Sequence, residues 1–288
     1  MDLSIIIPSF NTKEILRHCL NSILDNTKNI NFEIIVIDNF SQDGSQEMIE
    51  KDFPMVILIK NKENLGFAKA NNQGIKRAGG KYLLFLNSDT IIVKGAIKKM
   101  FDFLEKHKEI AALGPKLLNS DSSVQPSAGF FPNLLVVFVM LFLEHFFGGR
   151  FVRTGYSCLR KVDWVMGAAL MVRKEIVGKI GGFDEKIFMY YDEVDLCYRI
   201  YKNGGAIYYY PDAEIIHLWQ RSSQSGREGP ILANYKGLIY FYQKHYGLGQ
   251  LWFLKILLRL KAIFSIVIGH IINNQYLVKT YEKAFKLV

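Results

Sequence analysis

Two acidic stretches hold the residues best suited to chemistry. The stretch FMYYDEVDLCYR places three carboxylates, those of Asp192, Glu193 and Asp195, within four positions behind a run of aromatic residues. The stretch LNSDT places Asp89 just beyond a run of large apolar residues, where a buried strand would end. A carboxylate at a strand end is a candidate metal ligand, and a separate acidic cluster is a candidate general base. A metal and a base together would suffice to move a group off a diphosphate.

The acidic cluster has two explanations. If a helix begins near Asp192, the three acids occupy its first turn, where the helix dipole stabilises negative charge. Alternatively, like charges this close raise the pKa of one carboxyl group toward neutrality, which is what a general base needs. The sequence leaves both explanations open.

Asp89 and His217 are the candidate metal ligands. A divalent ion on the Asp89 carboxylate would neutralise a departing diphosphate as negative charge develops on it. His217 lies in a later strand-like stretch, where a lone histidine is more often structural, but it is also the candidate for a second ligand. Hard oxygen ligands favour Mg²⁺ or Mn²⁺, and a histidine ligand shifts the preference toward Mn²⁺.

Short apolar runs alternate with helical stretches over the first hundred residues. This alternation predicts an α/β fold with a mostly parallel central sheet, flanked by helices that make right-handed crossovers. The predicted strands are 4–7, 33–37, 55–59 and 82–86, and the predicted helices are 12–26, 42–51, 67–78 and 94–107.

Polar residues follow each of the four predicted strands. Because ligands bind outside the carboxyl ends of parallel strands, we expect these loops to form one site. Asp38 either caps its own turn through Ser41 or Gly44 or meets the N3–H donor of a pyrimidine, with a ring N–H of guanine as the alternative to the pyrimidine. The stretch from Asn64 either caps a helix or faces a phosphate, with Lys69 near it. The loop residues, in chain order, are Pro8, Ser9, Phe10, Asn11, Asp38, Asn39, Asn64, Gly66, Asn87, Ser88 and Asp89.

The second half of the chain is less regular. Turn formers dominate residues 114–129 and the polar stretch 220–229, and both predict loops. The other predicted elements are a strand, glycine turn and strand over 162–172, a helix over 194–202, and strands over 206–210 and 213–218.

The composition indicates a globular chain in a reducing compartment. Its 288 residues are 50% hydrophobic, which is enough for a substantial core. Cys19, Cys158 and Cys197 lie far apart and form no C-x-x-C pair, which argues against a disulfide framework or a zinc site. Strand-like sequence starts directly after the first residues, so we expect no cleavable signal peptide.

The net charge of +9 is concentrated near the end of the chain. From 251 to 288, six basic residues and the single acid Glu282 lie among bulky apolar residues. This pattern favours an anionic membrane surface over nucleic acid, with an amphipathic core helix or a dimer contact as the alternative. The apolar stretch 134–147 is too short to cross a membrane, and 251–272 is interrupted by basic residues. We therefore expect a peripheral membrane association.

Six sequence stretches and one histidine indicate a family through their order and spacing. They are SIIIPSFN (4–11), IDNFSQDGS (37–45), NLGFAKANNQG (64–74), LNSDT (86–90), GAALMVRKE (167–175), GGFDEKIFMYYDEVDLCYR (181–199) and His217. In this order they resemble the family-2 inverting glycosyltransferases of the GT-A fold, and within them bacterial enzymes of cell-surface polysaccharide synthesis, rhamnosyltransferases among them. The resemblance covers about residues 1–245 and leaves 246–288 as a basic helical segment for membrane association or dimerisation.

The resemblance implies a role for each candidate residue. Glu193 occupies the position of the catalytic base, but the family often has Glu-Asp where this chain has Asp192-Glu193, so the identity of the base is open. The motif's first acid is Asn87 here, so a metal would depend on Asp89, His217 and the diphosphate. The stretch 220–229, with Arg221 and Arg227, would close over the diphosphate. The nucleotide would be held by Pro8, Ser9, Phe10, Asn11, Asp38, Asn39, Asn64, Gly66, Lys69, Asn87 and Ser88, and the acceptor by Trp164, Gly167, Ala168 and Asp195.

The implied activity is metal-dependent transfer of a sugar, for example rhamnose, with inversion. The donor would be a UDP- or dTDP-sugar, and the acceptor a lipid-linked saccharide at the cytoplasmic face of the membrane. A homodimer is compatible with the apolar tail. One alternative is a nucleotidyltransferase, which should carry a basic glycine-rich loop in place of PSFN. The other is a non-catalytic membrane-associated protein that binds nucleotide sugars.

Overall fold

A computed structural model describes residues 1–144, 152–218 and 228–288, and the chain forms two compact units. The first unit comprises Met1–Gly129, Thr154–Phe188 and Asp192–Ser222. The second comprises Phe130–Arg153, Met189–Tyr191 and Ser223–Val288. The boundary expected between residues 245 and 246 stays a prediction.

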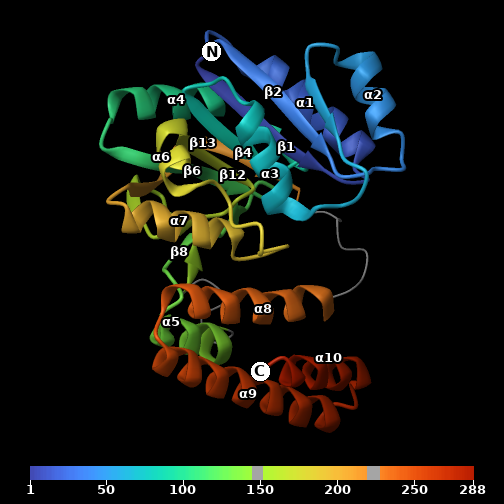
Figure 1. The fold of residues 1–288 in the computed structure, drawn as a ribbon, viewed down its shortest axis with the longest axis vertical. Coiled ribbons are helices and arrows are strands. Elements are labelled where there is room, and N and C mark those ends of the chain that lie inside the picture. Colours follow the sequence, from blue (N-terminus) through green and yellow to red (C-terminus); the bar gives the residue numbers. More distant parts are fainter. Residues whose placement is uncertain (145–151, 219–227) are drawn as a thin grey trace. The chain divides into compact units, whose positions relative to one another are not determined.

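The first unit is built on a ten-stranded sheet, which confirms the predicted mixed α/β class (Figure 1). The main path runs β3-β2-β1-β4-β12-β6-β13-β10, with β5 paired to β13 and β7 paired to β6. Strands β3, β2, β1 and β4 are mutually parallel, so their carboxyl ends share one edge as predicted. A second sheet joins β11, β8 and β9. The bounds are β1 Leu3–Ser9, β2 Phe32–Asp38, β3 Ile57–Lys60, β4 Tyr82–Leu86, β5 Thr90–Ile92, β6 Ile110–Leu118, β7 Val124–Gln125, β8 Ala128–Gly129, β9 Arg153–Thr154, β10 Arg160–Val162, β11 Trp164–Val165, β12 Ala169–Arg173 and β13 Ala206–His217.

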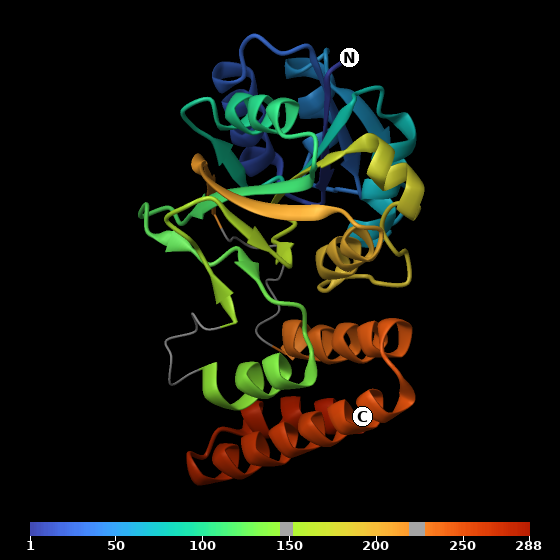
Figure 2. The ribbon, with the colours of Figure 1, turned by 90° about the vertical axis from the view of Figure 1, so that its left-hand side faces the viewer.

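Helices cover both faces of the main sheet (Figure 2). Alternate residues of β1, for example Ile5 and Ile7, enter the core formed with α1, α2 and α4. Ile6 points to the other face, where its Cγ2 would lie 2.4 Å from a Cβ added to Gly74 of α3. Burial on both faces explains why the strands are apolar throughout. The helices of this unit are α1 Lys13–Asn26, α2 Ser45–Asp52, α3 Gly66–Arg77, α4 Ala96–Lys106, α6 Lys174–Ile180 and α7 Asp192–Lys202.

Two elements differ from the sequence predictions. The turn-rich range 114–129 begins inside strand β6, because Gly114 and Pro115 are strand residues. A Cβ on Gly114 would lie 2.6 Å from the Cβ of Val165. This glycine therefore allows β6 to approach Val165 closely and is not part of a turn. The two strands predicted around Pro211 are one strand, β13, whose pairing with β6 shifts register between Tyr210 and Glu214. A β-bulge therefore accommodates the proline without ending the strand.

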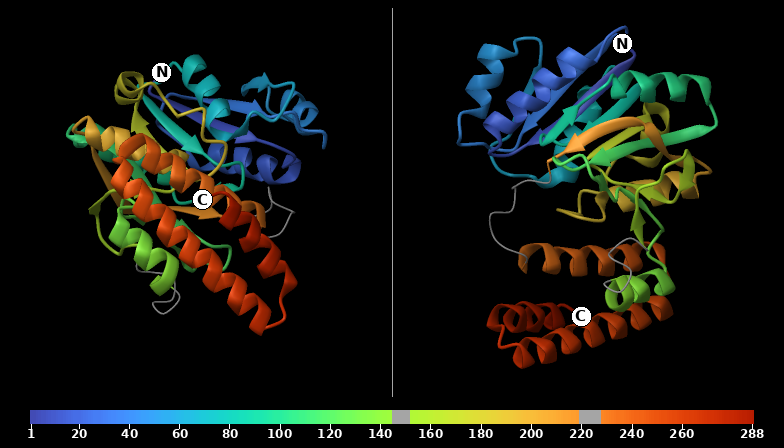
Figure 3. Two further views of the ribbon diagram at one scale, coloured as in Figure 1. Left: turned by 60° about the horizontal axis from the view of Figure 1, so that its bottom comes forward. Right: turned by 180° about the vertical axis from the view of Figure 1, so that it is seen from behind.

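The second unit is helical (Figure 3). Its long helix α9 packs against α10 and α5, and a Cβ on Gly269 would lie only 2.8 Å from Val278 of α10. Within the described ranges, no helix combines the length and apolarity needed to span a membrane. The elements are α5 Leu134–Phe138, a π-helical continuation Val139–Leu143, α8 Glu228–His245, α9 Leu248–Ile271 and α10 Gln275–Lys286.

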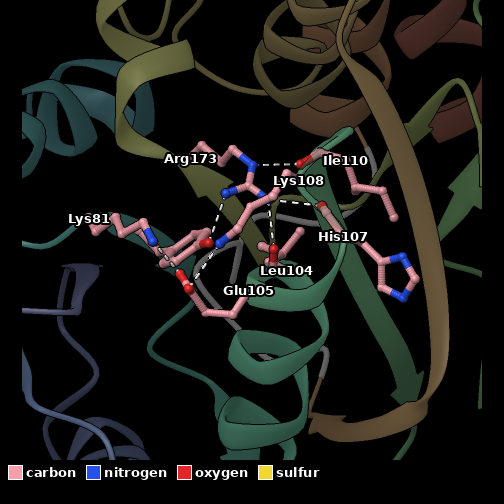
Figure 4. Close-up of polar contacts among 8 residues, drawn as sticks. Lys81, Leu104, Glu105, His107, Lys108, Ile110 and Arg173 are labelled. Atoms are coloured by element: carbon pink, nitrogen blue, oxygen red, sulfur yellow. Dashed lines mark hydrogen bonds and ion pairs between the residues drawn. The ribbon is translucent and has the colours of Figure 1, made fainter.

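Arg173, the last residue of β12, ties the sheet edge opposite the polar loops to helix α4 (Figure 4). Its side chain is buried and donates through Nη2 to the carbonyl oxygens of Leu104, at 2.6 Å, and His107, at 2.9 Å. Nε donates to the carbonyl of Ile110 and Nη1 to the hydroxyl of Tyr82, both at 2.8 Å. Arg173 thus satisfies carbonyls that the end of α4 leaves without helical partners.

We predict that Arg173→Met lowers the free energy of unfolding by about 3 kcal/mol, because buried carbonyl groups lose a charged donor. Equilibrium urea unfolding measures the change. Lys81→Ala is the control: it removes a largely exposed ion pair with Glu105 in the same region and should cost less than about 1 kcal/mol. Equal stability of Arg173→Met and wild type would show that Arg173 does not hold this edge together.

Candidate functional site

The loops after β1 and β2 are bound to each other by direct hydrogen bonds. The backbone N–H of Asn11 donates to Ser41 Oγ at 2.9 Å, and the N–H of Gln42 donates to Asn11 Oδ1 at 2.8 Å. The N–H of Asn39 donates to the carbonyl of Ser9 at 2.8 Å. Asn11 has φ 51°, a left-handed conformation that asparagine tolerates. The structure therefore brings the residues predicted after β1 next to those predicted after β2.

The carboxylate of Asp38 is fully buried and only half satisfied. Its Oδ1 accepts from the Ser41 N–H at 2.9 Å and from Gln46 Nε2 at 2.6 Å. Its Oδ2 is buried and has no hydrogen-bond partner among the described residues. Turn capping through Ser41 therefore occurs, but it engages one oxygen and leaves the other in need of a donor.

The start of α3 is joined to the β2 loop. Asn39 Nδ2 donates to the Gly66 carbonyl at 3.4 Å, and Asn39 Oδ1 accepts from Asn61 Nδ2 at 2.8 Å. Asn64 Oδ1 accepts from the Gly66 N–H at 3.0 Å. Gly66 has φ +81°, and an added Cβ would lie 2.8 Å from the ring of Phe188, so only glycine suits this position. Lys69, one turn later, is exposed. Asn64 therefore binds the N–H of the first helical residue, although Leu65 occupies the N-cap position, and a phosphate contact by Lys69 stays a prediction.

The structure brings Asp89 and His217 together, although 128 positions separate them in the sequence. Strand β13 pairs His217 with Thr90, and this places His217 Nε2 3.2 Å from Asp89 Oδ1. Two neighbouring ligands of an octahedral ion, each about 2.1 Å from it, lie about 3 Å apart, so this pair fits one divalent ion. No group of three histidine, cysteine or acidic residues that could hold a metal occurs among the residues described. The pair would therefore need further ligands from a substrate.

Hydrogen bonds connect the polar residues beyond β4 with the other loops. Ser88 Oγ accepts from Thr12 Oγ1 at 3.2 Å, and Thr12 Oγ1 lies 3.0 Å from Ser9 Oγ. The N–H of Asn87 donates to the carbonyl of Ala168 at 3.0 Å. The β4 loop thus lies between the β1 loop and the start of β12.

Gly167 links this region to the acidic cluster. A Cβ on Gly167 would lie 3.4 Å from the Cβ of Glu193 and 3.6 Å from the ring of Phe67. Helix α7 begins at Asp192, so the three acids occupy its first turn, as one of the two explanations requires. Glu193 therefore belongs to the same region of the first unit as Ala168 and the β4 loop.

The three acids of α7 have different surroundings. Asp192 is buried, and its pKa is raised well above the ordinary value of 3.8 by burial, and further by the charge of Glu193 and a hydrogen bond to it. Glu193 is the more exposed of the two. Asp195 is fully buried and accepts from Arg199 Nε at 2.8 Å. The first-turn position of the three acids is therefore confirmed, and the raised pKa belongs to Asp192 and arises chiefly from burial. Which acid acts as a base stays a prediction.

The carboxylate of Asp195 is engaged in the ion pair with Arg199, and its acceptor-binding role stays a prediction. Trp164, another predicted acceptor residue, is buried in β11. Residues 220–227 of the expected closing loop, Arg221 and Arg227 included, lie outside the described residues.

Some polar residues of the site were not predicted. Asn72 of α3 accepts from the Phe183 N–H at 2.8 Å and donates to the Phe183 carbonyl at 2.9 Å, which fixes the segment that leads to α7. Gln125 of β7 lies 2.7 Å from His217 Nδ1. Both contacts join residues about ninety or more positions apart, so no local pattern signals them.

The comparisons with known proteins agree on family and fold. Residues 4–179, more than half of the chain, match the model of the family described as Glycosyl transferase family 2. An N-acetylglucosaminyl-diphospho-decaprenol L-rhamnosyltransferase of Mycobacterium tuberculosis is 30% identical over 232 residues, which span 74% of this chain and 76% of the relative. A poly(ribitol-phosphate) beta-glucosyltransferase of Bacillus spizizenii is 32% identical over 40% of this chain and 19% of its own length.

Two solved structures share the fold. GalNAc-T7 with UDP, GalNAc and Mn²⁺ superposes with a TM-score of 0.62 at 15% identity and covers 84% of this chain and 50% of its own. The mannosyltransferase PcManGT from Pyrobaculum calidifontis, in complex with GDP-Man and Mn²⁺, gives a TM-score of 0.60 at 14% identity and covers 98% of this chain and 73% of its own. At this identity the likeness establishes the GT-A fold.

We predict that the raised pKa of Asp192 makes wild-type stability fall as pH rises. The folded protein keeps this proton, whereas the unfolded chain loses it near pH 3.8, so unfolding is increasingly favoured above about pH 4. Asp192→Asn should lack this contribution, and its stability relative to wild type should increase with pH in urea unfolding.

Glu214→Gln is a control of opposite sign. A hydrogen bond from Lys116 lowers the pKa of Glu214, so the wild-type carboxylate adds stability as pH rises toward the ordinary value of 4.5. The stability of Glu214→Gln relative to wild type should therefore decrease with pH. A pH-independent difference for Asp192→Asn would contradict the raised pKa.

Proposed function

The chain belongs to glycosyl transferase family 2, and on this premise we propose that it is an inverting, metal-dependent transferase acting on a lipid-linked saccharide. The donor that we propose is a pyrimidine nucleoside diphosphate sugar, of the UDP or dTDP type. The observation that carries the proposal is the proximity, within one compact unit, of Glu193, Gly167 and the β4 loop that holds Asp89. The proposed base, the proposed acceptor-side glycine and the candidate metal pair therefore lie in one region.

The orphaned oxygen of Asp38 supports a pyrimidine donor. A uracil or thymine ring carries one N3–H donor, and Asp38 Oδ2 is a buried acceptor without a partner among the described residues. Binding would satisfy an oxygen whose burial otherwise costs free energy. The rest of the nucleotide would be held by residues of the neighbouring loops and of α3, namely Pro8 to Asn11, Asn39, Asn64, Gly66 and Lys69. Asn87 and Ser88 would contact the diphosphate.

Asp89 and His217 would hold a divalent ion, Mn²⁺ or Mg²⁺. The ion would supply positive charge to the diphosphate that leaves. The spacing of the two side chains fits one ion, and the diphosphate oxygens would complete its ligands. The pairing of β13 with β5 holds both side chains in place.

Glu193 would act as the general base in a single displacement. The acceptor hydroxyl oxygen forms a bond to the anomeric carbon while the bond from that carbon to the diphosphate oxygen breaks. The hydroxyl proton passes to the Glu193 carboxylate, and the nucleoside diphosphate departs with the bonding electrons. Attack on the face opposite the leaving group inverts the configuration. Gly167, with Ala168 and Trp164 beside it in sequence, would border the acceptor.

The proposed acceptor class rests on the name of the Mycobacterium tuberculosis relative. That rhamnosyltransferase carries an N-acetylglucosaminyl-diphospho-decaprenol in its name, so we propose a lipid-linked saccharide as acceptor here and rhamnose as a candidate sugar. A lipid-linked acceptor requires the enzyme to work at a membrane, and we place it at the cytoplasmic face.

Helix α9 supports a membrane surface as the partner of the second unit. Its buried residues recur every three to four positions, from Leu254 to Gly269, and form one stripe. The opposite side exposes large apolar side chains, with 60% exposure for Phe264 and 78% for Ile271. The range 251–288 carries six basic residues and one acid, which complements anionic lipid. An apolar face in a basic segment suits the boundary between headgroups and acyl chains.

We predict that the protein binds UDP or dTDP more tightly with Mn²⁺ than without it, and that Asp89→Ala loses the gain. Glu193→Gln should keep this binding within about twofold and lose turnover by about 100-fold or more, because its amide cannot accept the proton. Isothermal titration and a donor-consumption assay measure the two quantities.

Three other outcomes of these measurements would change the proposed function. Full turnover by Glu193→Gln would assign the base to Asp192. Tight binding of GDP alone would contradict the pyrimidine assignment. Failure of all three nucleotides to bind would favour a membrane-associated protein that keeps the fold without the activity.

We predict that the protein sediments with vesicles of phosphatidylcholine and phosphatidylglycerol, and less so at high salt. Phe264→Glu should lower the vesicle affinity about tenfold or more, because burial of a phenylalanine is worth about 2 kcal/mol. Met55→Glu, at a position 61% exposed in the first unit, is the control and should bind like wild type. A dimer in solution that Phe264→Glu dissociates, without vesicle binding, would instead make this face a subunit contact.

A further inference from the structure

Gln125 lies between the candidate metal pair and a polar turn on β6 and β7. Its side chain is 2% exposed, and its Oε1 lies 2.7 Å from His217 Nδ1. Its Nε2 donates to Asn119 Oδ1 at 2.9 Å. None of the sequence motifs includes Gln125, and Val124–Gln125 form a strand of only two residues. A buried glutamine with both ends engaged beside His217 needs an explanation.

The hydrogen bonds beyond Gln125 allow only one assignment of donors and acceptors. Ser123 Oγ donates to the Asp121 carboxylate at 2.6 Å, and hydrogen bonds from the Ser123 hydroxyl and backbone lower the pKa of Asp121, so this acid is an acceptor. Ser123 has a single hydroxyl proton and therefore accepts from Asn119 Nδ2, at 2.9 Å. Asn119 Oδ1 must then face the donor end of Gln125, and Gln125 Oε1 faces His217.

This order assigns the protons of His217. Because Gln125 Oε1 can only accept, His217 Nδ1 carries a hydrogen. In a neutral imidazole the lone pair then lies on Nε2. The side chain of Asn87 agrees, since its Nδ2 donates and lies 3.3 Å from Nε2. Two amides on different strands and loops therefore favour the same tautomer.

The lone pair on Nε2 is on the side of Asp89. Nε2 lies 3.2 Å from Asp89 Oδ1, so a cation bound beside the carboxylate oxygen would take the Nε2 lone pair in place of the Asn87 amide hydrogen. We propose that Gln125 is a positioning residue that holds His217 in the Nδ1–H tautomer and so presents Nε2 as a metal ligand. The metal in this inference is the ion of the proposed function, and the tautomer itself can be measured without it.

A purely structural role would have different consequences. If Gln125 only fills space under β13, an apolar side chain of equal length should serve equally well. If it sets the tautomer, loss of the Oε1 acceptor should redistribute the proton between the two ring nitrogens. The same loss should weaken metal binding, because partners behind a metal ligand typically change affinity about 10- to 100-fold.

The direct test is nitrogen NMR of metal-free protein with labelled histidine, at mildly alkaline pH. His217→Asn identifies the signals of His217 among the six histidines. We expect a protonated Nδ1 and a pyridine-type Nε2 in wild type, and a mixture of tautomers in Gln125→Met. A wild-type His217 with the proton on Nε2 would overturn the proposal whether or not any variant folds.

Metal affinity gives a second readout. Mn²⁺ is titrated into protein saturated with UDP or dTDP, whichever binds, and free Mn²⁺ is followed by electron paramagnetic resonance. Gln125→Met should bind Mn²⁺ about 10- to 100-fold more weakly. Gln125→Glu keeps an acceptor for Nδ1–H and should recover most of the affinity, and Val124→Ala, on the same short strand, should match wild type.

The outcomes separate this inference from the proposed function. If wild type binds no Mn²⁺, the metal-dependent function fails, while the tautomer still decides the role of Gln125. If wild type binds Mn²⁺ and Gln125→Met binds it equally well with an unchanged tautomer, Gln125 is structural and the inference fails.

Discussion

The antiparallel pairing of β12 with β4 is the contact on which the site depends. Leu86 at the end of β4 lies opposite Ala169 at the start of β12, so the loop that leaves one strand meets the loop that enters the other. The hydrogen bond from the Asn87 N–H to the Ala168 carbonyl continues the ladder by one step. Gly167, the residue before Ala168, lies close to Glu193. One strand pair therefore brings Asn87 and the rest of the β4 loop close to Glu193.

The parts of the site that follow single strands could be predicted from the sequence. Apolar runs ending in polar residues predicted the parallel edge, and Asp38, Asn39 and Asn87 lie there. The prediction worked because strand period and buried faces are local properties. The hydrogen bond from the Gly66 N–H to the Asn64 side chain was equally local.

The parts that depend on distant strands could not be predicted in the same way. Strand β6 contains Gly114 and Pro115, which by themselves indicate a turn, and its pairing with β13 overrides that local preference. The turn 119–123 that orients Gln125 consists of residues typical of any surface loop. Its importance appears only when β13, about ninety positions later, places His217 beside it. Residue type alone made Asp89 and His217 candidate ligands, whereas the orientation of His217 required the structure.

The two neighbouring acids at the start of α7 differ because the helix turns between them. Asp192 and Asp195, three positions apart, lie on the buried side of the helix, and Glu193 lies on the more exposed side. Asp195 is compensated by Arg199, whereas burial and the neighbouring Glu193 raise the pKa of Asp192. Glu193 has the longer and more exposed of the two neighbouring side chains, so it is the better placed to meet a substrate hydroxyl. This difference in exposure supports the proposal that Glu193, and not Asp192, is the base.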